Sequence, residues 1–113
     1  MTVKWKPVLT APDVRRAGEG DHTFTLLLDP YGLYILRAED AERAAEDTLR
    51  NILTRSPNVF VAYEDMLDLP LEADPPVLTV ISTKGDFVLH FPVGAAETAR
   101  ALRAEALRRR PAR

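Results

Sequence analysis

Residues 22–37 read HTFTLLLDPYGLYILR, and this stretch predicts a β-hairpin. Residues 22–28 and 33–37 are rich in threonine and apolar side chains, which are typical of strands. The intervening residues 29–32 (Asp-Pro-Tyr-Gly) supply turn chemistry. Proline presets φ for the second position of a turn, and glycine accepts the positive φ that closes many turns. The fold is therefore expected to contain an antiparallel sheet built outward from this hairpin.

A second hairpin and a helix are predicted towards the end of the chain. Residues 77–82 and 87–91 flank a Thr-Lys-Gly-Asp sequence whose central Lys-Gly pair can occupy a tight turn. Residues 93–109 instead repeat apolar side chains every three or four positions, with arginines mostly on the opposite face. This spacing predicts a helix, which Pro111 ends.

The remaining stretches complete an α+β pattern. We expect an edge strand over residues 3–9, a connecting loop over residues 10–21, a helix over residues 39–55 and one long or bent strand over residues 59–71. Trp5 should face inward from the first of these, because apolar and polar residues alternate around it. Asp40 is expected to be the N-cap of the helix.

The composition is that of one ordinary globular domain. The 113 residues are 46% hydrophobic and 28% charged. We expect a single domain with a core over about residues 21–107 and an arginine-rich tail over residues 108–113. The sequence has no apolar run of roughly 18 to 20 residues and no secretory signal, so a cytoplasmic location is expected. Because cysteine is absent, disulfides, thiolate metal sites and cysteine nucleophiles are excluded.

The order of these elements resembles a pleckstrin-homology-like (PH-like) domain, particularly of the bacterial and GRAM-like type. The resemblance rests on the paired strands of residues 23–28 and 33–36 and on the hairpin of residues 77–91 with its following helix. It also rests on residues 63–66 (Tyr-Glu-Asp-Met), where such domains often carry an aromatic-acidic-aliphatic strand. It implies a bent antiparallel sheet or partly open barrel, with an inserted helix and a C-terminal helix that caps the open end.

The same resemblance has implications for function. Lipid-binding members gather basic residues around the loop that joins their first strands, whereas this chain has Asp-Pro-Tyr-Gly at residues 29–32. That turn offers no cation to a phosphate, so phosphoinositide binding is not expected. The resemblance implies instead a small interaction or scaffold module that binds protein partners or self-associates, without a cofactor.

Charge is distributed unevenly along the chain. Residues 39–74 contain ten acids and three arginines, whereas residues 100–113 contain six arginines and one glutamate. An acidic face and a basic tail on one chain permit self-association that salt should screen. The candidate interaction residues are two tyrosines of the first hairpin, if exposed, and four arginines of the C-terminal arginine cluster: Tyr31, Tyr34, Arg103, Arg108, Arg109 and Arg110.

Two other functions remain open on the sequence. The arginine cluster could contact nucleic-acid phosphates, although the acidic middle segment would repel them. The acids of residues 64–74 could hold a metal ion in a small enzyme, although they lack the order of a calcium loop. His22 and His90 are interpreted as solvated strand residues, and no catalytic or metal-binding residue is assigned. The preferred hypothesis is a non-catalytic interaction module.

Overall fold

The computed structural model of the chain describes residues 6–44 and 48–111. In these residues one antiparallel sheet contains eight strands: β1 (Leu9–Arg16), β2 (Thr23–Leu28), β3 (Gly32–Arg37), β4 (Val59–Ala62), β5 (Met66–Asp68), β6 (Leu71–Ala73), β7 (Pro76–Ser82) and β8 (Gly85–His90). Their order is β4-β3-β2-β1-β8-β7-β5, with β6 also paired to β7. The sheet is open, and its helices are α1 (Ala38–Ala41), α2 (Leu49–Leu53) and α3 (Ala96–Arg109). The predicted α+β class is confirmed.

Both predicted hairpins and the last helix are confirmed. In the first hairpin Leu28 pairs with Leu33, and in the second Ser82 pairs with Gly85. Gly85 has a φ of 125°, which glycine adopts without the steric cost that a side chain would add. Gly32 does not have the positive φ predicted for the first turn, and its place there follows instead from the close approach of β4. Local turn signals and side-chain periodicity are nevertheless sufficient to place these three elements.

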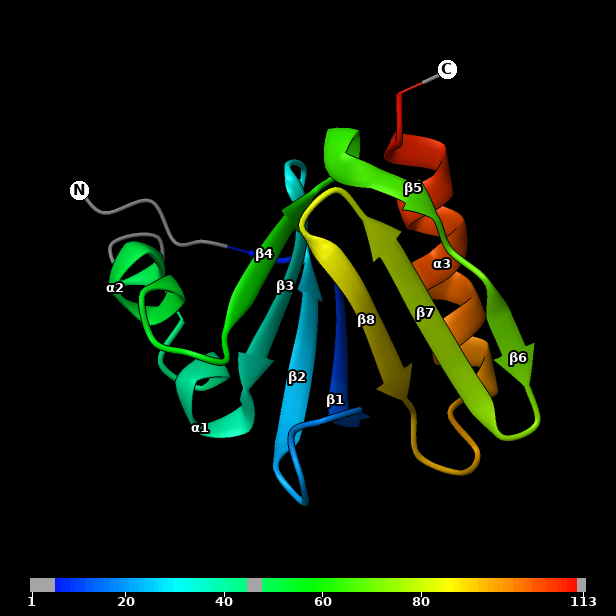
Figure 1. Cartoon of the computed structure of the whole chain (residues 1–113), viewed down its shortest axis with the longest axis horizontal. Coiled ribbons are helices and arrows are strands. Elements are labelled where there is room, and N and C mark those ends of the chain that lie inside the picture. Colours follow the sequence, from blue (N-terminus) through cyan, green and yellow to red (C-terminus); the bar gives the residue numbers. More distant parts are fainter. Residues whose placement is uncertain (1–5, 45–47, 112–113) are drawn as a thin grey trace.

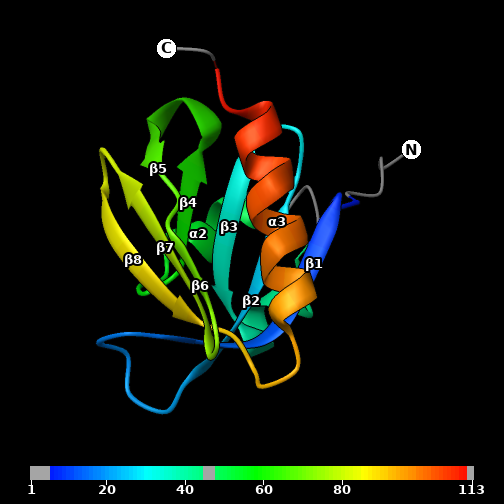
Figure 2. The same ribbon diagram turned by 90° about the vertical axis from the view of Figure 1, so that its right-hand side faces the viewer.

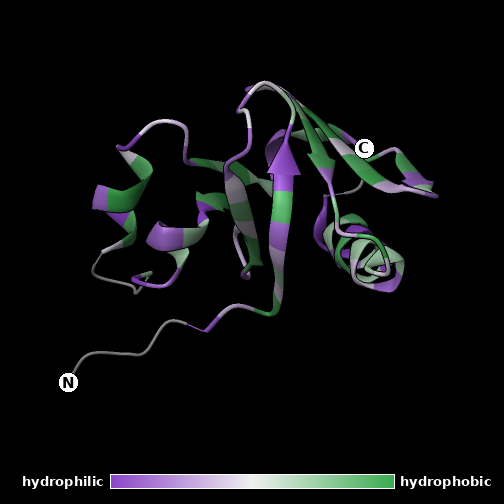
Figure 3. Ribbon diagram, turned by 90° about the horizontal axis from the view of Figure 1, so that it is seen from below, coloured by the Kyte–Doolittle hydropathy of each residue, from purple (hydrophilic) through white to green (hydrophobic). Residues whose placement is uncertain are grey.

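Helices cover two faces of the sheet. Helix α3 packs against β1, β6 and β7, and its buried Ala99, Leu102 and Ala106 join the main core. On the opposite face, Leu49 and Ile52 of α2 join a second cluster with side chains of β2 and β3. Figure 3 shows α3 on one side of the strands and the α1–α2 segment on the other. Because both faces of β2 and β3 are buried, the sequences of these two strands are almost continuously apolar.

The sheet has two parts that meet at a narrow junction. Strands β1–β4 form one part and β5–β8 the other (Figure 1). Between the parts, β1 and β8 pair only at Arg15 with His90 and at Arg16 with Leu89. Because α3 contacts β1 on one side and β6 and β7 on the other, it connects the two parts (Figure 2).

The predicted loop over residues 10–21 is wrong in its first half, which forms β1. Ala11 and Val14 are buried in the core, and pairing with β2 supplies the backbone hydrogen bonds. The register shifts between these two residues, and Asp13 has a φ of 59°, so a bulge accommodates Pro12 within the strand. Of the strand predicted over residues 3–9, only Leu9 is in β1, and Trp5 lies outside the described residues.

The predicted helix over residues 39–55 is also wrong in part. Two short helices occupy this region, and residues 45–47 lie outside the described part of the chain. The N-cap position of α1 is Arg37, and Asp40 is a buried residue inside the helix. The carboxylate of Asp40 does not cap a helix but contacts Asn58 and Arg55, which are distant in sequence. These contacts determine where the α1–α2 segment folds back onto the sheet.

The single long strand predicted over residues 59–71 is divided. It consists of β4, a 3₁₀ turn (η1, Tyr63–Asp65), β5 and the start of β6. The division follows from the topology, because the chain must cross from the β3 edge to the β7 edge between β4 and β5. None of the described helices is long and apolar enough to cross a membrane.

Candidate interaction surface at one end of the sheet

The turn between β2 and β3 is fixed by a buried carboxylate. Asp29 accepts hydrogen bonds from the backbone N–H groups of Tyr31 (2.8 Å) and Gly32 (3.1 Å) and from the hydroxyl of Tyr34 (2.9 Å). Tyr34 is buried in the second apolar cluster, whereas Tyr31 is 73% exposed. The turn therefore exposes the side chain of Tyr31 to solvent, whereas Tyr34 is buried and stabilises the turn through its hydrogen bond to Asp29.

Tyr63 ties the crossover η1 to the same turn. Its backbone N–H donates to the carbonyl of Tyr31 (3.3 Å), and its hydroxyl donates to the carbonyl of Asp29 (2.6 Å). Burial raises the pKa of Tyr63 to about 12, although the positive charge of Arg109 opposes the shift. Burial and the hydrogen bond to Asp29 raise the pKa of Tyr34 well above its ordinary value.

Arg103 of α3 and Arg110, which follows the helix, fix it against the β5–β6 edge. Arg103 Nε donates to the carbonyl of Leu69 (2.6 Å), and Arg110 Nη1 donates to the carbonyl of Leu67 (2.8 Å). Arg109 donates to Glu105 (2.9 Å), and so does Arg108. Hydrogen bonds from these two arginines, first from Arg108, lower the pKa of the Glu105 carboxyl.

These elements meet at one end of the molecule. The β2–β3 turn, η1 and the C-terminal end of α3 lie together in both Figure 1 and Figure 2. We define the tyrosine–arginine surface by the side chains exposed or half-buried there: Tyr31, Leu67, Arg108, Arg109 and Arg110. Its apolar part is substantial, because Tyr31 is 73% and Leu67 45% exposed. Its three arginines are accompanied at this end by Glu105 of α3 and by Glu64 and Asp65 of η1.

The structure thus places the sequence-predicted residues in two groups. Tyr63 links Tyr31 to the arginines, because its N–H bonds to the carbonyl of Tyr31 and the charges of Arg109 and Arg108 act on its hydroxyl, although more than 70 residues separate Tyr31 from the arginines. Tyr34 is buried against Asp29 and is unavailable to a partner, which corrects its place among the candidates. Arg103 is half-buried and bonded to Leu69, so its role in this structure is to hold α3.

Sequence reasoning missed Leu67, Glu105 and the buried anchors of the turn. The spacing of Glu105 to Arg108 and Arg109, three and four residues later on a helix, is a signal that could have indicated the ion pairs. No local signal marks Leu67, because its exposure depends on where the crossover from β4 to β5 runs.

The acidic segment lies beside the arginines of the same chain. Backbone carbonyls of Leu67 and Leu69 bind arginines of α3, while Glu64, Asp68, Glu72 and Asp74 are exposed. Within the described residues no three histidine, aspartate or glutamate side chains are grouped to hold a metal ion. His22 and His90 are exposed.

Comparison with known protein families and with curated proteins gave no match to this chain. The functional assignment consequently depends on the chemistry of the tyrosine–arginine surface.

We expect the free energy of unfolding to fall with rising pH above about pH 10, partly because of Tyr63. A pKa raised in the folded state stabilises the protein fully below the unfolded value, and this contribution is lost as the pH rises through the folded value of about 12. Urea unfolding followed by circular dichroism from about pH 8 to about pH 11.5 measures it. Tyr63→Phe should flatten the decline, and equal slopes in the two proteins would contradict the assignment.

Proposed function

We propose that the protein is a small, non-catalytic interaction module of PH-like type that binds a protein partner through the tyrosine–arginine surface. The observation that carries this proposal is the exposed ring of Tyr31 on the β2–β3 turn, at the same end of the molecule as the last turn of α3, which contains Arg108 and Arg109 (Figure 2). Tyrosine and arginine are enriched where protein interfaces concentrate their binding energy. Because the backbone of Tyr31 is already fixed by Asp29 and Tyr63, less backbone entropy is lost on binding.

The PH-like part of the proposal is supported by the arrangement of the elements. Four antiparallel strands are followed by four more and by a C-terminal helix that packs on the curved sheet. The segment with α1 and α2, between β3 and β4, departs from the usual short connection of the family. Because one fold serves many functions, the choice of a protein partner rests on the surface itself.

The surface favours an acidic partner with an apolar group. Arg108 is 66% exposed despite its ion pair with Glu105, and Leu67 adds an apolar patch. A second copy of the chain offers such a partner, because Asp68, Glu72 and Asp74 are exposed along its β5–β6 edge and the turn that follows. Self-association and binding of another acidic protein therefore use the same chemistry.

Light scattering at low and high salt, with and without peptides rich in aspartate and leucine, tests the proposal. We expect a complex at low salt, either a discrete oligomer or a peptide adduct, that high salt weakens. Tyr31→Ser and Arg108→Gln should each weaken it by about tenfold or more. Arg15→Gln is the matched control, because Arg15 is 61% exposed and lies at the end of β1.

A monomer that binds none of the peptides at either salt concentration would overturn the proposal. Binding that Arg15→Gln weakens as much as Arg108→Gln would also overturn it, because general charge would then explain the binding. A shift caused only by a mixed oligonucleotide pool, abolished by Arg108→Gln and insensitive to Tyr31→Ser, would instead support nucleic-acid binding.

A further inference from the structure

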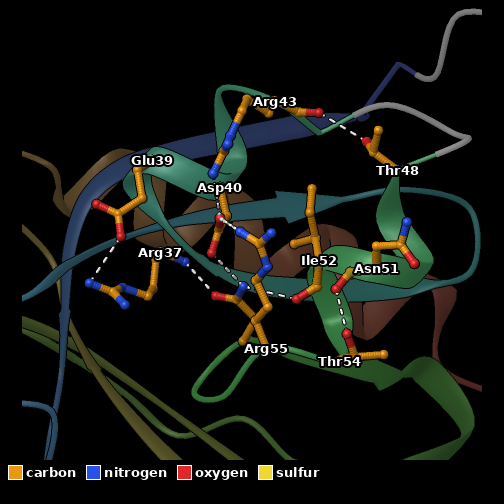
Figure 4. Close-up of polar contacts among 10 residues, drawn as sticks. Arg37, Glu39, Asp40, Arg43, Thr48, Asn51, Ile52, Thr54 and Arg55 are labelled. Carbon is orange, nitrogen blue, oxygen red and sulfur yellow. Dashed lines mark hydrogen bonds and ion pairs between the residues drawn. The ribbon is translucent and has the colours of Figure 1, made fainter.

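A second charged site lies around Asp40, on the face of the sheet that is opposite α3 and is covered by the α1–α2 segment. This carboxylate is only 4% exposed and accepts a hydrogen bond from Asn58 Nδ2 at 2.7 Å. Its Oδ1 oxygen lies 3.2 Å from Arg43 Nη2 and 3.6 Å from Arg55 Nη1. Figure 4 shows Asp40 between the two arginines. One buried anion therefore holds two cationic side chains side by side.

Asn58 makes this arrangement rigid. Besides binding Asp40, its Nδ2 donates to the carbonyl of Ile52 (3.0 Å), and its Oδ1 accepts from the backbone N–H of Arg37 (2.7 Å). These bonds join the end of β3, the end of α2 and the residue before β4. Asp40 and its two arginines are thus fixed relative to the sheet.

A pocket of about 180 Å³ opens beside the arginine pair. Its lining is Arg43, Thr48, Asn51, Ile52 and Arg55, which we call the arginine pocket. The side chains of Arg43 and Arg55 are 65% and 62% exposed, so much of each remains accessible. A guanidinium carries five N–H donors, and contact with one carboxylate oxygen does not use them all.

We propose that the arginine pocket binds a phosphate group. Two guanidinium forks beside one pocket match an anion that presents several oxygens, and arginine binds phosphate in bidentate fashion. Asp40 neutralises one of the two positive charges, so one remains for the ligand. Thr48 and Asn51 add polar groups, and Ile52 supplies an apolar wall. Free phosphate, a soluble phosphomonoester and a lipid headgroup share this chemistry.

The arginine pocket is independent of the tyrosine–arginine surface. Its residues belong to the α1–α2 segment, on the opposite side of the strands from α3 (Figure 3). Loss of one site should therefore leave binding at the other intact, and the two proposals can fail separately.

Titration calorimetry and melting temperature, with inorganic phosphate and phenyl phosphate as probes, test the arginine pocket. We expect saturable binding and a rise in melting temperature with phosphate concentration. Arg43→Lys and Arg55→Lys keep the charge beside Asp40 but lose the planar fork, and each should bind about tenfold more weakly. Asn51→Ala, at an exposed lining residue, should weaken binding less and preserve the fold. Arg50→Gln is the control, because Arg50 is exposed on α2 but does not line the pocket.

Vesicles that contain phosphatidic acid form a third arm. If the protein binds only the vesicles, and Arg43→Lys and Arg55→Lys abolish this binding, the ligand is a lipid headgroup. If it binds the soluble probes, the ligand is a small phosphate compound. Absence of binding in all three arms would overturn the proposal. Binding that Arg50→Gln weakens as much as Arg43→Lys would overturn it too, because a general surface charge would account for it.

Discussion

Replacement of Gly32 by alanine is expected to destabilise the protein by more than about 4 kcal/mol, enough to unfold most of a marginally stable domain. A Cβ at this position would lie 2.3 Å from the carbonyl oxygen of Val61 and 2.9 Å from both Ala62 Cα and Phe60 Cε1. Two of these three atoms are backbone, so relief requires that β3 and β4 separate. The buried faces of both strands oppose that movement.

Urea unfolding followed by circular dichroism measures this effect, and Gly18→Ala is the matched control. Gly18 has a conformation that favours glycine, with a φ of 89°, which Gly32 does not have, but a Cβ at Gly18 would meet nothing within 4 Å. The control should cost only about 1 to 2 kcal/mol, the strain of a left-handed alanine. If the two variants were equally stable, the close approach of β3 to β4 would be refuted.

Asp29→Ala is expected to cost about 3 kcal/mol or more, because the carboxylate serves three donors at once. Without it, the N–H of buried Gly32 and the hydroxyl of buried Tyr34 lose their acceptor in a place that water reaches poorly. An unsatisfied buried polar group costs about 1 to 3 kcal/mol. Since Tyr31 is positioned by the same carboxylate, the tyrosine–arginine surface should lose its order as well.

Two variants isolate the cause. Asp29→Asn keeps an oxygen for the two backbone donors, and its amide can donate to the Tyr34 hydroxyl, so we expect it to cost about 1 kcal/mol. Tyr34→Phe removes a single hydrogen bond of the group and should cost a similar amount. Equal stability of Asp29→Ala and Tyr34→Phe, measured by urea unfolding, would mean that Asp29 does not hold the turn.

Elements specified by local chemistry could be predicted from the sequence. The turn around Gly32, the Lys-Gly turn before β8 and the spacing of α3 each fix conformation within a few residues. Strand β1 could not, because Pro12 and the nearby glycines indicate a loop when considered alone. Its strand conformation depends on pairing with β2 and with β8. Strand β8 is distant in sequence, and the glycine-containing connection between β1 and β2 does not indicate a hairpin.

The two sites differ in how far the sequence could indicate them. The sequence indicates Tyr31 and the C-terminal arginines as candidate interaction residues. Only the fold shows that the β2–β3 turn and the C-terminal end of α3 lie at the same end of the molecule. The arginine pocket was missed because Asp40 has the features of an N-cap in a continuous helix. Its actual partners, Arg55 and Asn58, lie 15 and 18 positions later and become neighbours when the segment turns back onto the sheet.

The position of α3 along the chain has a consequence for how the protein is made. All eight strands precede this helix, yet it is α3 that covers the inner face of the sheet and bridges the short β1–β8 junction. During synthesis from the N-terminus, any sheet that forms early has an uncovered apolar face until residues 96–109 have left the ribosome. A chain whose sheet forms before the helix has emerged is prone to aggregation until the helix docks.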